Sequence, residues 1–335
     1  MAEPLHIESP LRRRLLQALA DGGWHSGQAL AELAGVSRAA VWKQMDALEK
    51  LGLGIERARG RGYRLSHAVS LLDEQVIRDA LSQHWRERLS LSLLESVAST
   101  NAWLADQPEP SDGRIQACLA EAQPQGRGRR GRVWHCPYGG GIPLSVAWHF
   151  EALDKGLSGL APSLAVAVAR ALESLGADAP GLKWPNDIVC DEGKLGGILI
   201  ELKGESAGPC QVRVGVGLNW VPPAAVDQPV AGLAALFPGA FPDRSRVAGR
   251  VLDALCSGMS DFARDGFEGV RADWKARDVL AGKPVRLALH DRSVEGRALG
   301  LDAAGALRIQ SSDGAETTWQ VGEVSVRLQS REETA

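Results

Sequence analysis

The sequence of 335 residues predicts an α/β (α+β) protein built in three parts. Three short helical patterns and a basic hairpin come first, strands and helices then alternate, and only short strands follow Lys283. Because the pattern changes near two points, we expect an N-terminal domain at 1–66, a central domain at 67–280 and a C-terminal domain at 281–335.

The composition is that of a globular protein with at least one large core. Hydrophobic residues make up 44% of the chain, charged residues 24%, and the formal net charge is -3. No apolar run approaches the ~20 residues of a membrane span, and residues 1–14 lack the apolar centre of a signal peptide. The five cysteines have no paired short spacing, which predicts reduced thiols in a cytoplasmic protein rather than a zinc site or a disulfide framework.

The pattern of the N-terminal domain predicts a winged helix-turn-helix. The leucines of 11–20 share one helical face, Ser26 precedes the second helix, and Ser37 is expected to cap the third. A glycine-rich basic tip at 59–62 follows in a predicted hairpin. The third helix has a stripe of buried residues at Val41, Met45 and Leu48 and is expected to end at about Leu51.

This domain is expected to bind DNA. A helix-turn-helix lays its second helix in the major groove. Four residues lie on or beside the outward face of that helix: Arg38, Ala39, Trp42 and Lys43. On the wing, Arg59 and Arg61, with Arg57 and Arg64, are placed to meet phosphates. A role as a protein-interaction module stays open as the alternative.

The central domain alternates strands with helices. Strands are predicted at 91–97, 114–122, 142–150, 197–202 and 211–218, and helices at 70–81, 160–176 and 245–276. Pro143 indicates that the third of these strands starts there or is irregular. After Lys283, short strands separated by turn residues predict a small β-barrel.

One segment of the central domain carries most of the chemical signal. Residues 125–134, QGRGRRGRVW, alternate glycine with arginine between two predicted strands. Glycines let a backbone wrap an anion, and arginines supply permanent charge with forked donors for phosphate and carboxylate. A Gly/Arg run alone could equally be a nucleic-acid segment or a solvated loop. Its place within a compact domain favours a binding loop.

Two further segments accompany it. Lys183-Trp184-Pro185-Asn186-Asp187 is followed by Lys194 just before two glycines, where a lysine can reach a ligand that the backbone passes closely. Ser99-Thr100-Asn101 follows a predicted strand and resembles a helix N-cap, although its polar groups could also bind a ligand. No Walker motif, zinc-protease motif or serine nucleophile elbow is present, and we assign no metal site to protein residues.

Taken in order, STN, Q-x-x-GRGRRGR-x-W, KWPND, KLGGILIEL and GVGLNW resemble the biotin–protein ligases. With the winged helix in front, the chain is similar to the bifunctional type that is both biotin–[acetyl-CoA-carboxylase] ligase and biotin operon repressor. The resemblance covers essentially all of residues 10–328. It implies a central mixed sheet like that of class II aminoacyl-tRNA synthetases and an SH3-like C-terminal domain.

The resemblance also implies which residues bind the substrates. Those implied to bind biotin are Ser99, Thr100, Asn101, Gln123, Arg127, Gly128, Arg129, Lys194 and Gly197. Those implied to bind ATP or the adenylate are Arg127, Arg129, Arg132, Trp134, Lys183, Asn186 and Asn219. Catalysis is implied for Arg129, Lys194 and Asp187, with Asp187 orienting or deprotonating the incoming lysine.

The implied reaction has two steps. The carboxylate of biotin attacks the α-phosphate of Mg²⁺-bound ATP to give biotinyl-5′-AMP, and a lysine of the biotin carboxyl carrier protein of acetyl-CoA carboxylase then takes the biotinyl group. The arginines, Lys194 and Mg²⁺ neutralise the phosphate oxygens, and closure of the Gly/Arg loop excludes water. The remaining implied partners are operator DNA of the biotin operon and a second copy of the chain, joined in a homodimer when biotinyl-AMP is bound.

Two other functions are weighed against this one. A lipoate–protein ligase or octanoyltransferase shares the catalytic fold, but the GRGRRGR and KWPND blocks argue against it. A transcription factor that senses a small molecule and has lost its enzyme activity is the other candidate. The presence of Lys194 and Arg129 speaks against that reading.

Overall fold

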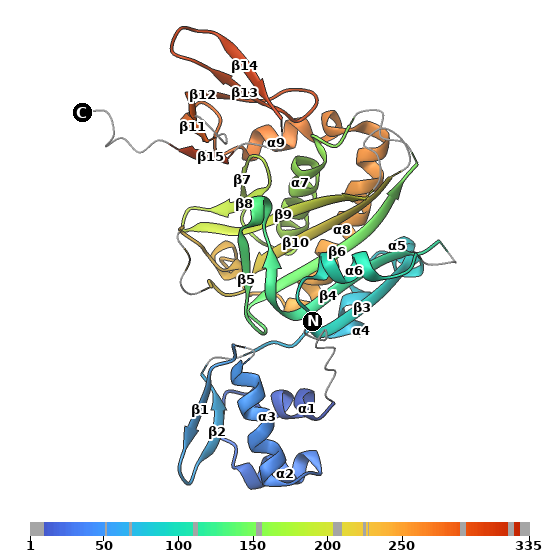
Figure 1. Cartoon of the computed structure of the whole chain (residues 1–335), viewed down its shortest axis with the longest axis vertical. Coiled ribbons are helices and arrows are strands. Elements are labelled where there is room, and N and C mark those ends of the chain that lie inside the picture. Colours follow the sequence, from blue (N-terminus) through green and yellow to red (C-terminus); the bar gives the residue numbers. More distant parts are fainter. Residues whose placement is uncertain are drawn as a thin grey trace, which may run out of the picture.

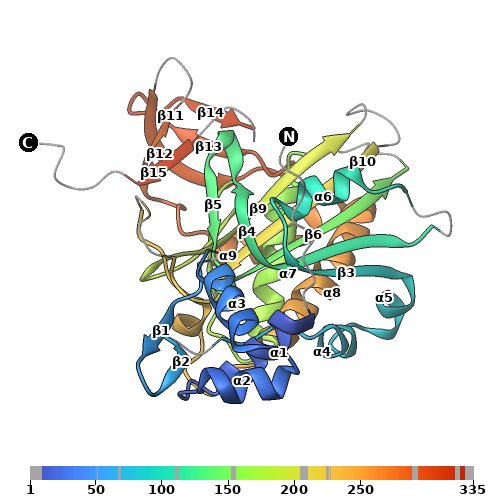
Figure 2. The same ribbon diagram turned by 60° about the horizontal axis from the view of Figure 1, so that its bottom comes forward.

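The computed structural model describes residues 10–50, 52–66, 69–109, 113–151, 156–203, 210–223, 226, 228–288, 293–320 and 325–328. The winged helix and the C-terminal sheet lie at different ends of the central domain in both views (Figures 1 and 2). The predicted helix end at Leu51, the start of the second domain at 67 and the tail from 329 lie outside the described residues. None of the described helices combines the length and apolar character that crossing a membrane requires.

The N-terminal domain is a winged helix-turn-helix, as predicted. Its elements are α1 (Pro10–Leu19), α2 (Gly27–Ala34), α3 (Arg38–Lys50), β1 (Ile55–Ala58) and β2 (Gly62–Leu65). The side chain of Ser26 accepts a hydrogen bond from Ala29 N–H at the start of α2, and Ser37 accepts one from Ala40 N–H at the start of α3. The predicted cap at Ser37 is therefore confirmed, and the structure adds a cap at Ser26.

The core of this domain extends into the central domain. Val41, Met45 and Leu48 are fully buried, which confirms the predicted stripe. The same apolar cluster includes Ala122 and Tyr138 from the central domain. The winged helix is thus docked on the central domain through shared apolar contacts.

The central domain is built on one mixed sheet. Its order among the described strands is β3-β4-β6-β10-β9-β8-β7, with β5 paired to β4. The strands are β3 (Leu89–Ser96), β4 (Ile115–Arg127), β5 (Val133–Cys136), β6 (Gly141–Phe150), β7 (Gly181–Lys183), β8 (Asp187–Cys190), β9 (Gly193–Lys203) and β10 (Cys210–Asn219). Among the described strands of this sheet, only β3 and β4 pair in parallel, and the other ladders are antiparallel.

Helices cover both faces of this sheet (Figure 1). They are α4 (Glu74–Asp79), α5 (Gln83–Arg88), α6 (Thr100–Asp106), α7 (Leu160–Glu173), α8 (Arg244–Asp265) and α9 (Arg271–Arg277), with 3₁₀ turns at Arg129–Gly131, Leu233–Leu236 and Phe267–Val270. Alternate residues of β10, such as Val212, Val214 and Val216, belong to the same core cluster as the buried residues of α7 and α8. The intervening Gly215 faces Asn101 of α6 on the opposite side. That opposite side is the one that carries the site.

The structure corrects four boundary predictions. Pro143 lies inside β6, which begins at Gly141; the β4 ladder ends at Leu144, so the missing N–H of Pro143 meets no β4 partner. The helix predicted at 245–276 is broken at Gly266, whose φ is 67°. The helix predicted from 70 begins only at Glu74, and the strand predicted at 114–122 continues to Arg127.

The C-terminal domain is an antiparallel sheet in the order β14-β13-β12-β11-β15. Its strands are β11 (Pro284–Ala288), β12 (Ser293–Leu301), β13 (Leu307–Gln310), β14 (Glu316–Trp319) and β15 (Ser325–Leu328). Its buried residues join the core cluster of the central domain, and the indole N–H of Trp184 donates to the Gly305 carbonyl at 3.1 Å. The third predicted part is therefore confirmed as an all-β unit packed on the second.

Candidate active site

A cavity of about 760 Å³ opens on the sheet face that carries α6. It gathers side chains from segments that are far apart in the sequence. The predicted site residues that line it are Ser99, Thr100, Asn101, Gln123, Arg127, Gly128, Arg129, Arg132, Trp134, Lys183, Asn186, Asp187, Lys194 and Gly197. The structure therefore brings all but one of the predicted substrate-binding residues to one place.

The polar end of the cavity is built on the start of α6. Ser99 caps this helix, accepting from Ala102 N–H at 3.4 Å, so the predicted cap and the predicted ligand segment are the same feature. The backbone N–H and the hydroxyl of Thr100 donate to Gln123 Oε1 at 2.7 and 3.0 Å. These bonds fix the side chain of Gln123 at the carboxyl end of β4.

Asn101 is the unsatisfied group of this end. Its side-chain amide is buried, and neither its oxygen nor its nitrogen has a hydrogen-bond partner within the described part of the chain. Buried amides are almost always hydrogen-bonded. Asn101 lines the cavity, so a polar group of a ligand can satisfy it there.

The Gly/Arg segment forms a turn at the rim. β4 extends to Arg127, β5 begins at Val133, and the N–H of Gly128 donates to the Arg132 carbonyl at 2.8 Å across the turn between them. Arg130 at its centre has a φ of 57°, in the left-handed region. The segment predicted as a loop is thus a short hairpin that holds its arginines at the cavity.

Arg129 is the arginine set deepest in this hairpin. One of its nitrogens donates to Asn186 Oδ1 at 3.2 Å, and another is buried with no partner among the described residues. Burial lowers the pKa of Arg129, and the nearby Asp187 opposes that shift. An anionic ligand in the cavity would both satisfy the open donor and offset the cost of burying the charge.

Lys194 and Asp187 face each other on neighbouring strands. The Nζ of Lys194 lies 2.5 Å from Asp187 Oδ1 and 5.8 Å from the ring centroid of Trp134. Both charged side chains are about one-fifth exposed, at 19% and 24%. Apart from this carboxylate, the charged side chains among the described residues that line the cavity are cationic, so this part of the site favours a polyanion.

Trp134 lines the cavity and packs against the backbone of β10 at Gly217. A Cβ at Gly217 would fall 2.4 Å from its ring, so only glycine at that position admits the indole. Gly215 does the same for Asn101, whose side-chain oxygen would lie 2.8 Å from a Cβ there. The GVG pattern of β10 therefore makes room for two predicted ligand residues.

Asn219 is the predicted substrate-binding residue that does not line the cavity. Its side-chain amide donates to the carbonyls of Lys194 and Ala231, at 3.1 and 3.2 Å. The backbone of Lys194 also pairs with the segment at Val230. Asn219 therefore ties the chain at 230–231 to β9 beside Lys194, and a contact with adenylate stays a prediction.

Sequence reasoning did not name several residues that line the cavity. Ser145 is the most informative, because it is fully buried and its hydroxyl donates to Thr100 Oγ1 at 2.7 Å. A lone serine inside the apolar run IPLSVAWHF was the available signal. Other lining residues outside the predicted set include Arg130, Val133, His135 and Pro229.

The predicted DNA-binding residues lie apart from the cavity. Arg38, Ala39, Trp42 and Lys43 are exposed on α3, and the indole of Trp42 is 54% exposed. Arg59 and Arg61 lie in the exposed turn of the wing, with Arg61 stacked over Trp24 at 4.6 Å. Arg57 and Arg64 instead pair with Glu49 and Glu56 at 2.7 Å, so they offer less to phosphates than their spacing predicted.

The comparisons with known proteins agree with this division. Residues 93–219 match the biotin/lipoate A/B protein ligase family, residues 11–64 an HTH domain, and residues 281–327 the biotin protein ligase C-terminal domain. A mixed sheet with a cationic cavity, matched in this way, defines the class as a biotin or lipoate protein ligase joined to a helix-turn-helix.

Two individual relatives define the family within this class. The bifunctional ligase/repressor BirA of Salmonella typhimurium is 34% identical over 93% of this chain and 96% of that protein. The biotin–[acetyl-CoA-carboxylase] ligase of Mycobacterium tuberculosis is 36% identical over 70% of this chain and 89% of that protein. The chain belongs to the family of bifunctional biotin ligase/repressors.

A solved structure supports the fold of the ligase part. Biotin protein ligase from Aquifex aeolicus in complex with biotin and ATP matches with a TM-score of 0.61 and 26% identity. The match covers 72% of this chain and 99% of the Aquifex aeolicus chain. The likeness therefore covers nearly the whole of that ligase.

Proposed function

We propose that this protein activates biotin with ATP and transfers it to a lysine of the biotin carboxyl carrier protein of acetyl-CoA carboxylase. The observation that carries the proposal is the single cavity that joins a polar pocket at Ser99–Asn101 to Arg129 and Lys194. Its volume of about 760 Å³ is in the range of sites that enclose both a small acid and a nucleotide. The relatives named above are ligases of this kind.

Biotin is proposed to bind with its ring at the polar pocket and its carboxylate toward the Gly/Arg hairpin. The open amide of Asn101 and the hydroxyls of Ser99 and Thr100 suit the polar ring system. Arg127, Gly128 and Lys194 then lie where a carboxylate needs cationic and backbone donors. This orientation puts the reacting carboxylate beside Arg129.

ATP is proposed to bind along the rest of the cavity. Arg129, Arg132 and Lys183 supply charge for its phosphates, Asn186 orients Arg129, and Trp134 supports the hairpin. Mg²⁺ enters as the counter-ion of the ATP substrate and supplies charge for its phosphate oxygens. In the described ranges no three His, Cys, Asp or Glu side chains gather that could hold a metal by themselves.

In the first step, an oxygen of the biotin carboxylate attacks the α-phosphorus of ATP. A new C–O–P anhydride bond forms, the bond to the β-phosphate breaks, and pyrophosphate leaves. Arg129 and Lys194 stabilise the negative charge that crowds at the α-phosphorus. The hairpin at 127–132 shields the anhydride from water.

In the second step, the neutral amine of the carrier lysine attacks the biotinyl carbonyl. The amide bond forms, the bond to the phosphate oxygen breaks, and AMP leaves with its negative charge. Among the described residues that line the cavity, Asp187 is the carboxylate that can orient the amine and take its proton. Its ion pair with Lys194, at 2.5 Å, holds the carboxylate at the cavity.

Pyrophosphate exchange into ATP tests the first step. We expect exchange that depends on biotin and is not supported by lipoate. Exchange driven by lipoate and not by biotin would replace biotin by lipoate as the substrate. Absence of exchange with either acid would favour a sensor that has lost its enzyme activity.

A second proposed function is repression of the biotin operon by a homodimer carrying biotinyl-AMP. The exposed residues of α3 and the exposed wing turn, with the match to an HTH domain, support operator binding. We expect binding of biotin-operon DNA to strengthen when biotin and ATP are present, together with dimerisation. Equal binding with and without the two substrates would refute this regulation. A cytoplasmic location follows from both activities.

The domain boundaries at 1–66, 67–280 and 281–335 are also a proposal. Each of the three family matches falls inside one of these ranges. Limited proteolysis tests them, with first cleavage expected near residues 66–69 and near 281. Early cleavage inside the central sheet would contradict the division.

A further inference from the structure

Two buried glutamates lie just upstream of the ligand-binding segments. Glu95 is near the end of β3, four residues before Ser99, and Glu121 is in β4, two residues before Gln123. The side chains of the two glutamates are 9% and 5% exposed. Because β3 and β4 are parallel neighbours, both glutamates lie close to the same end of the sheet.

Glu95 binds the winged helix directly. One nitrogen of Arg12, on α1, donates to Glu95 Oε1 at 3.1 Å, and another donates to Gln44 Oε1 at 3.1 Å. Gln44 lies on α3, the helix expected to enter the major groove. The guanidinium of Arg12, 7% exposed, therefore joins the DNA-binding helix to the strand that leads into the biotin pocket.

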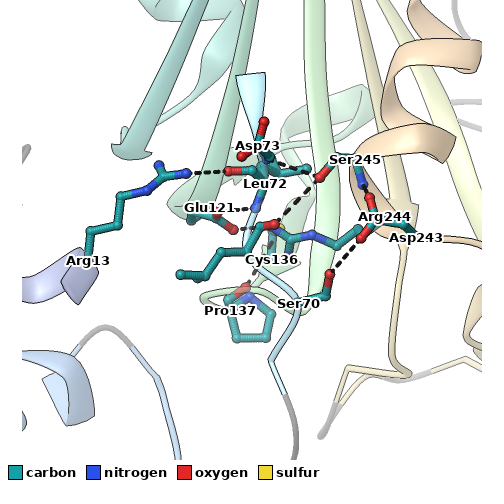
Figure 3. Close-up of polar contacts among 11 residues, drawn as sticks. Arg13, Ser70, Leu72, Asp73, Glu121, Cys136, Pro137, Asp243, Arg244 and Ser245 are labelled. Carbon is teal, nitrogen blue, oxygen red and sulfur yellow. Dashed lines mark hydrogen bonds and ion pairs between the residues drawn. The ribbon is translucent and has the colours of Figure 1, made fainter. Parts of the chain in front are cut away.

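Glu121 makes a second connection, through Leu72 in the segment between β2 and α4 (Figure 3). It accepts the N–H of Leu72 at 2.6 Å and pairs with Arg244, while the carbonyl of Leu72 accepts from Arg13 of α1 at 2.9 Å. Burial, together with Glu121 and Glu95, raises the pKa of Tyr138. Both glutamates thus act on one buried phenol that packs in the core shared with the winged helix.

Both ion pairs are largely buried. A buried charge that loses its partner is left without compensation, so such a pair strongly disfavours separation of its two partners. A ligand that orders Ser99–Asn101 and Gln123 also holds the ends of β3 and β4. Occupancy of the site and docking of the winged helix are then energetically linked.

We propose that Arg12 is a positioning residue that couples biotin binding to the docking of the winged helix within a single protomer. The inference rests on the proposed function, because it takes biotin as the ligand. It assigns to the Arg12–Glu95–Gln44 contact a role that dimerisation does not supply. The coupling is reciprocal: biotin stabilises the docked winged helix by the same factor by which docking strengthens biotin binding. Loss of the contact therefore removes both effects.

Hydrogen exchange of the full chain tests this coupling. Amide exchange in α1 and α3 is measured with and without biotin, without ATP, at concentrations where sedimentation shows monomer. The variants are Arg12→Leu, the charge swap Arg12→Glu with Glu95→Arg, and Arg14→Leu as the matched control on an exposed position of α1. The amide of Gln44 can turn to donate to a glutamate at 12, so the swap can rebuild the whole contact.

We expect biotin to slow exchange in α1 and α3 at least about fivefold in the wild type and in Arg14→Leu. In Arg12→Leu this protection is lost, and calorimetry shows a matching rise in the Kd for biotin. The charge swap restores both. A contact that is only structural would change exchange equally with and without biotin.

Three results would overturn the inference. If biotin binds the wild type but leaves exchange in α1 and α3 unchanged, the two sites are not coupled and only the inference fails. If Arg12→Leu keeps the full protection by biotin, the coupling does not run through Arg12. If biotin does not bind the wild type in the calorimeter, the proposed function itself is overturned, and the inference with it.

Discussion

Arg129 is the residue on which we expect retention of the adenylate to depend most. It is held by Asn186, it has a buried open donor, and its charge is costly to bury without an anion. We predict that Arg129→Gly releases the adenylate about 10–100-fold faster, since a charge-assisted hydrogen bond contributes roughly 1.5–3 kcal/mol. Rapid gel filtration of enzyme loaded with labelled biotinyl-AMP measures the release.

Arg129→Lys serves as the comparison for that variant. It keeps the charge and loses the forked donors, so its rate of adenylate release is expected to lie between those of the wild type and Arg129→Gly. Retention by Arg129→Gly as long as by the wild type would contradict the role given to the hairpin.

Substitutions at Lys194 and at Asp187 are expected to affect the two half-reactions differently. Lys194→Met removes a cation from both steps, so we expect loss of both exchange and transfer by at least about 100-fold. Asp187→Asn keeps the side chain's size and is expected to retain exchange within about tenfold while slowing transfer more strongly. Single-turnover transfer from preloaded enzyme measures the second step. Equal slowing of both steps in Asp187→Asn would remove its proposed role toward the lysine.

At this scale the sequence predicted residues better than it predicted their partners. Ser99, Gln123 and Lys194 line the cavity as expected, because their motifs are local. Ser145 was missed, since its partner Thr100 is 45 residues away and pairing across a sheet cannot be read from spacing. Asn219 was named for a ligand, although its amide holds two backbone carbonyls.

β10 contributes to the site because Gly217 has no side chain and leaves room for the indole of Trp134. Adding a Cβ at Gly217 brings it to 2.4 Å from the Trp134 ring. We predict that Gly217→Ala displaces this indole, costs about 1–3 kcal/mol of stability and weakens adenylate binding. Gly239→Ala is the control, because a Cβ there has nothing within 4 Å. Unchanged adenylate affinity in Gly217→Ala would show that the indole does not support the site.

The buried pair of Glu121 and Arg244 joins β4 to α8 (Figure 3). Arg244 is fully buried, so Arg244→Met leaves the Glu121 charge without its partner and should cost about 3–5 kcal/mol. Replacing both residues, with Glu121→Leu added, should recover much of that loss, and exposed Arg246→Met should cost under about 0.5 kcal/mol. Urea unfolding measures each value. A double variant less stable than Arg244→Met would contradict this account.

Elements were predictable where one pattern decided them. The cap at Ser37 rests on a local hydrogen bond, which the sequence indicates. The break at Gly266 is a local C-cap in which glycine adopts a φ of 67°, and an apolar periodicity does not report it. The regular strand around Pro143 depends on pairing across the sheet, which the periodicity does not report either. The same is true of β4, which extends to Arg127 because β5 returns to pair with it.

In the whole molecule, the winged helix with α3 and the wing lies at one end, below the sheet whose strands carry residues that line the cavity (Figure 1). We predict that Arg59→Ala and Arg61→Ala each lower the salt dependence of operator binding by about one unit of slope. Arg57→Ala should lower it less, because Glu49 already pairs with that arginine. Fluorescence titrations at several salt concentrations measure the slopes. An equal effect of all three substitutions would mean that the ion pair of Arg57 and Glu49 opens when DNA binds.

The order of domains was readable from the sequence because each part has its own period. How the parts meet was not, since Arg12 and Glu95 are 83 residues apart and neither belongs to a motif. Within the central domain, Glu121 and Arg244 are 123 residues apart, and their pairing could not be predicted either. Contacts between residues far apart in the sequence therefore carry the information that only the structure adds.

The most direct test of the central claim is the mass of an acceptor carrier domain after incubation with the protein, ATP and biotin. We predict an increase equal to one biotinyl group on a single lysine, dependent on both substrates and abolished in Lys194→Met. An unmodified acceptor with the wild-type protein, or a lipoyl group added when lipoate replaces biotin, would contradict the account.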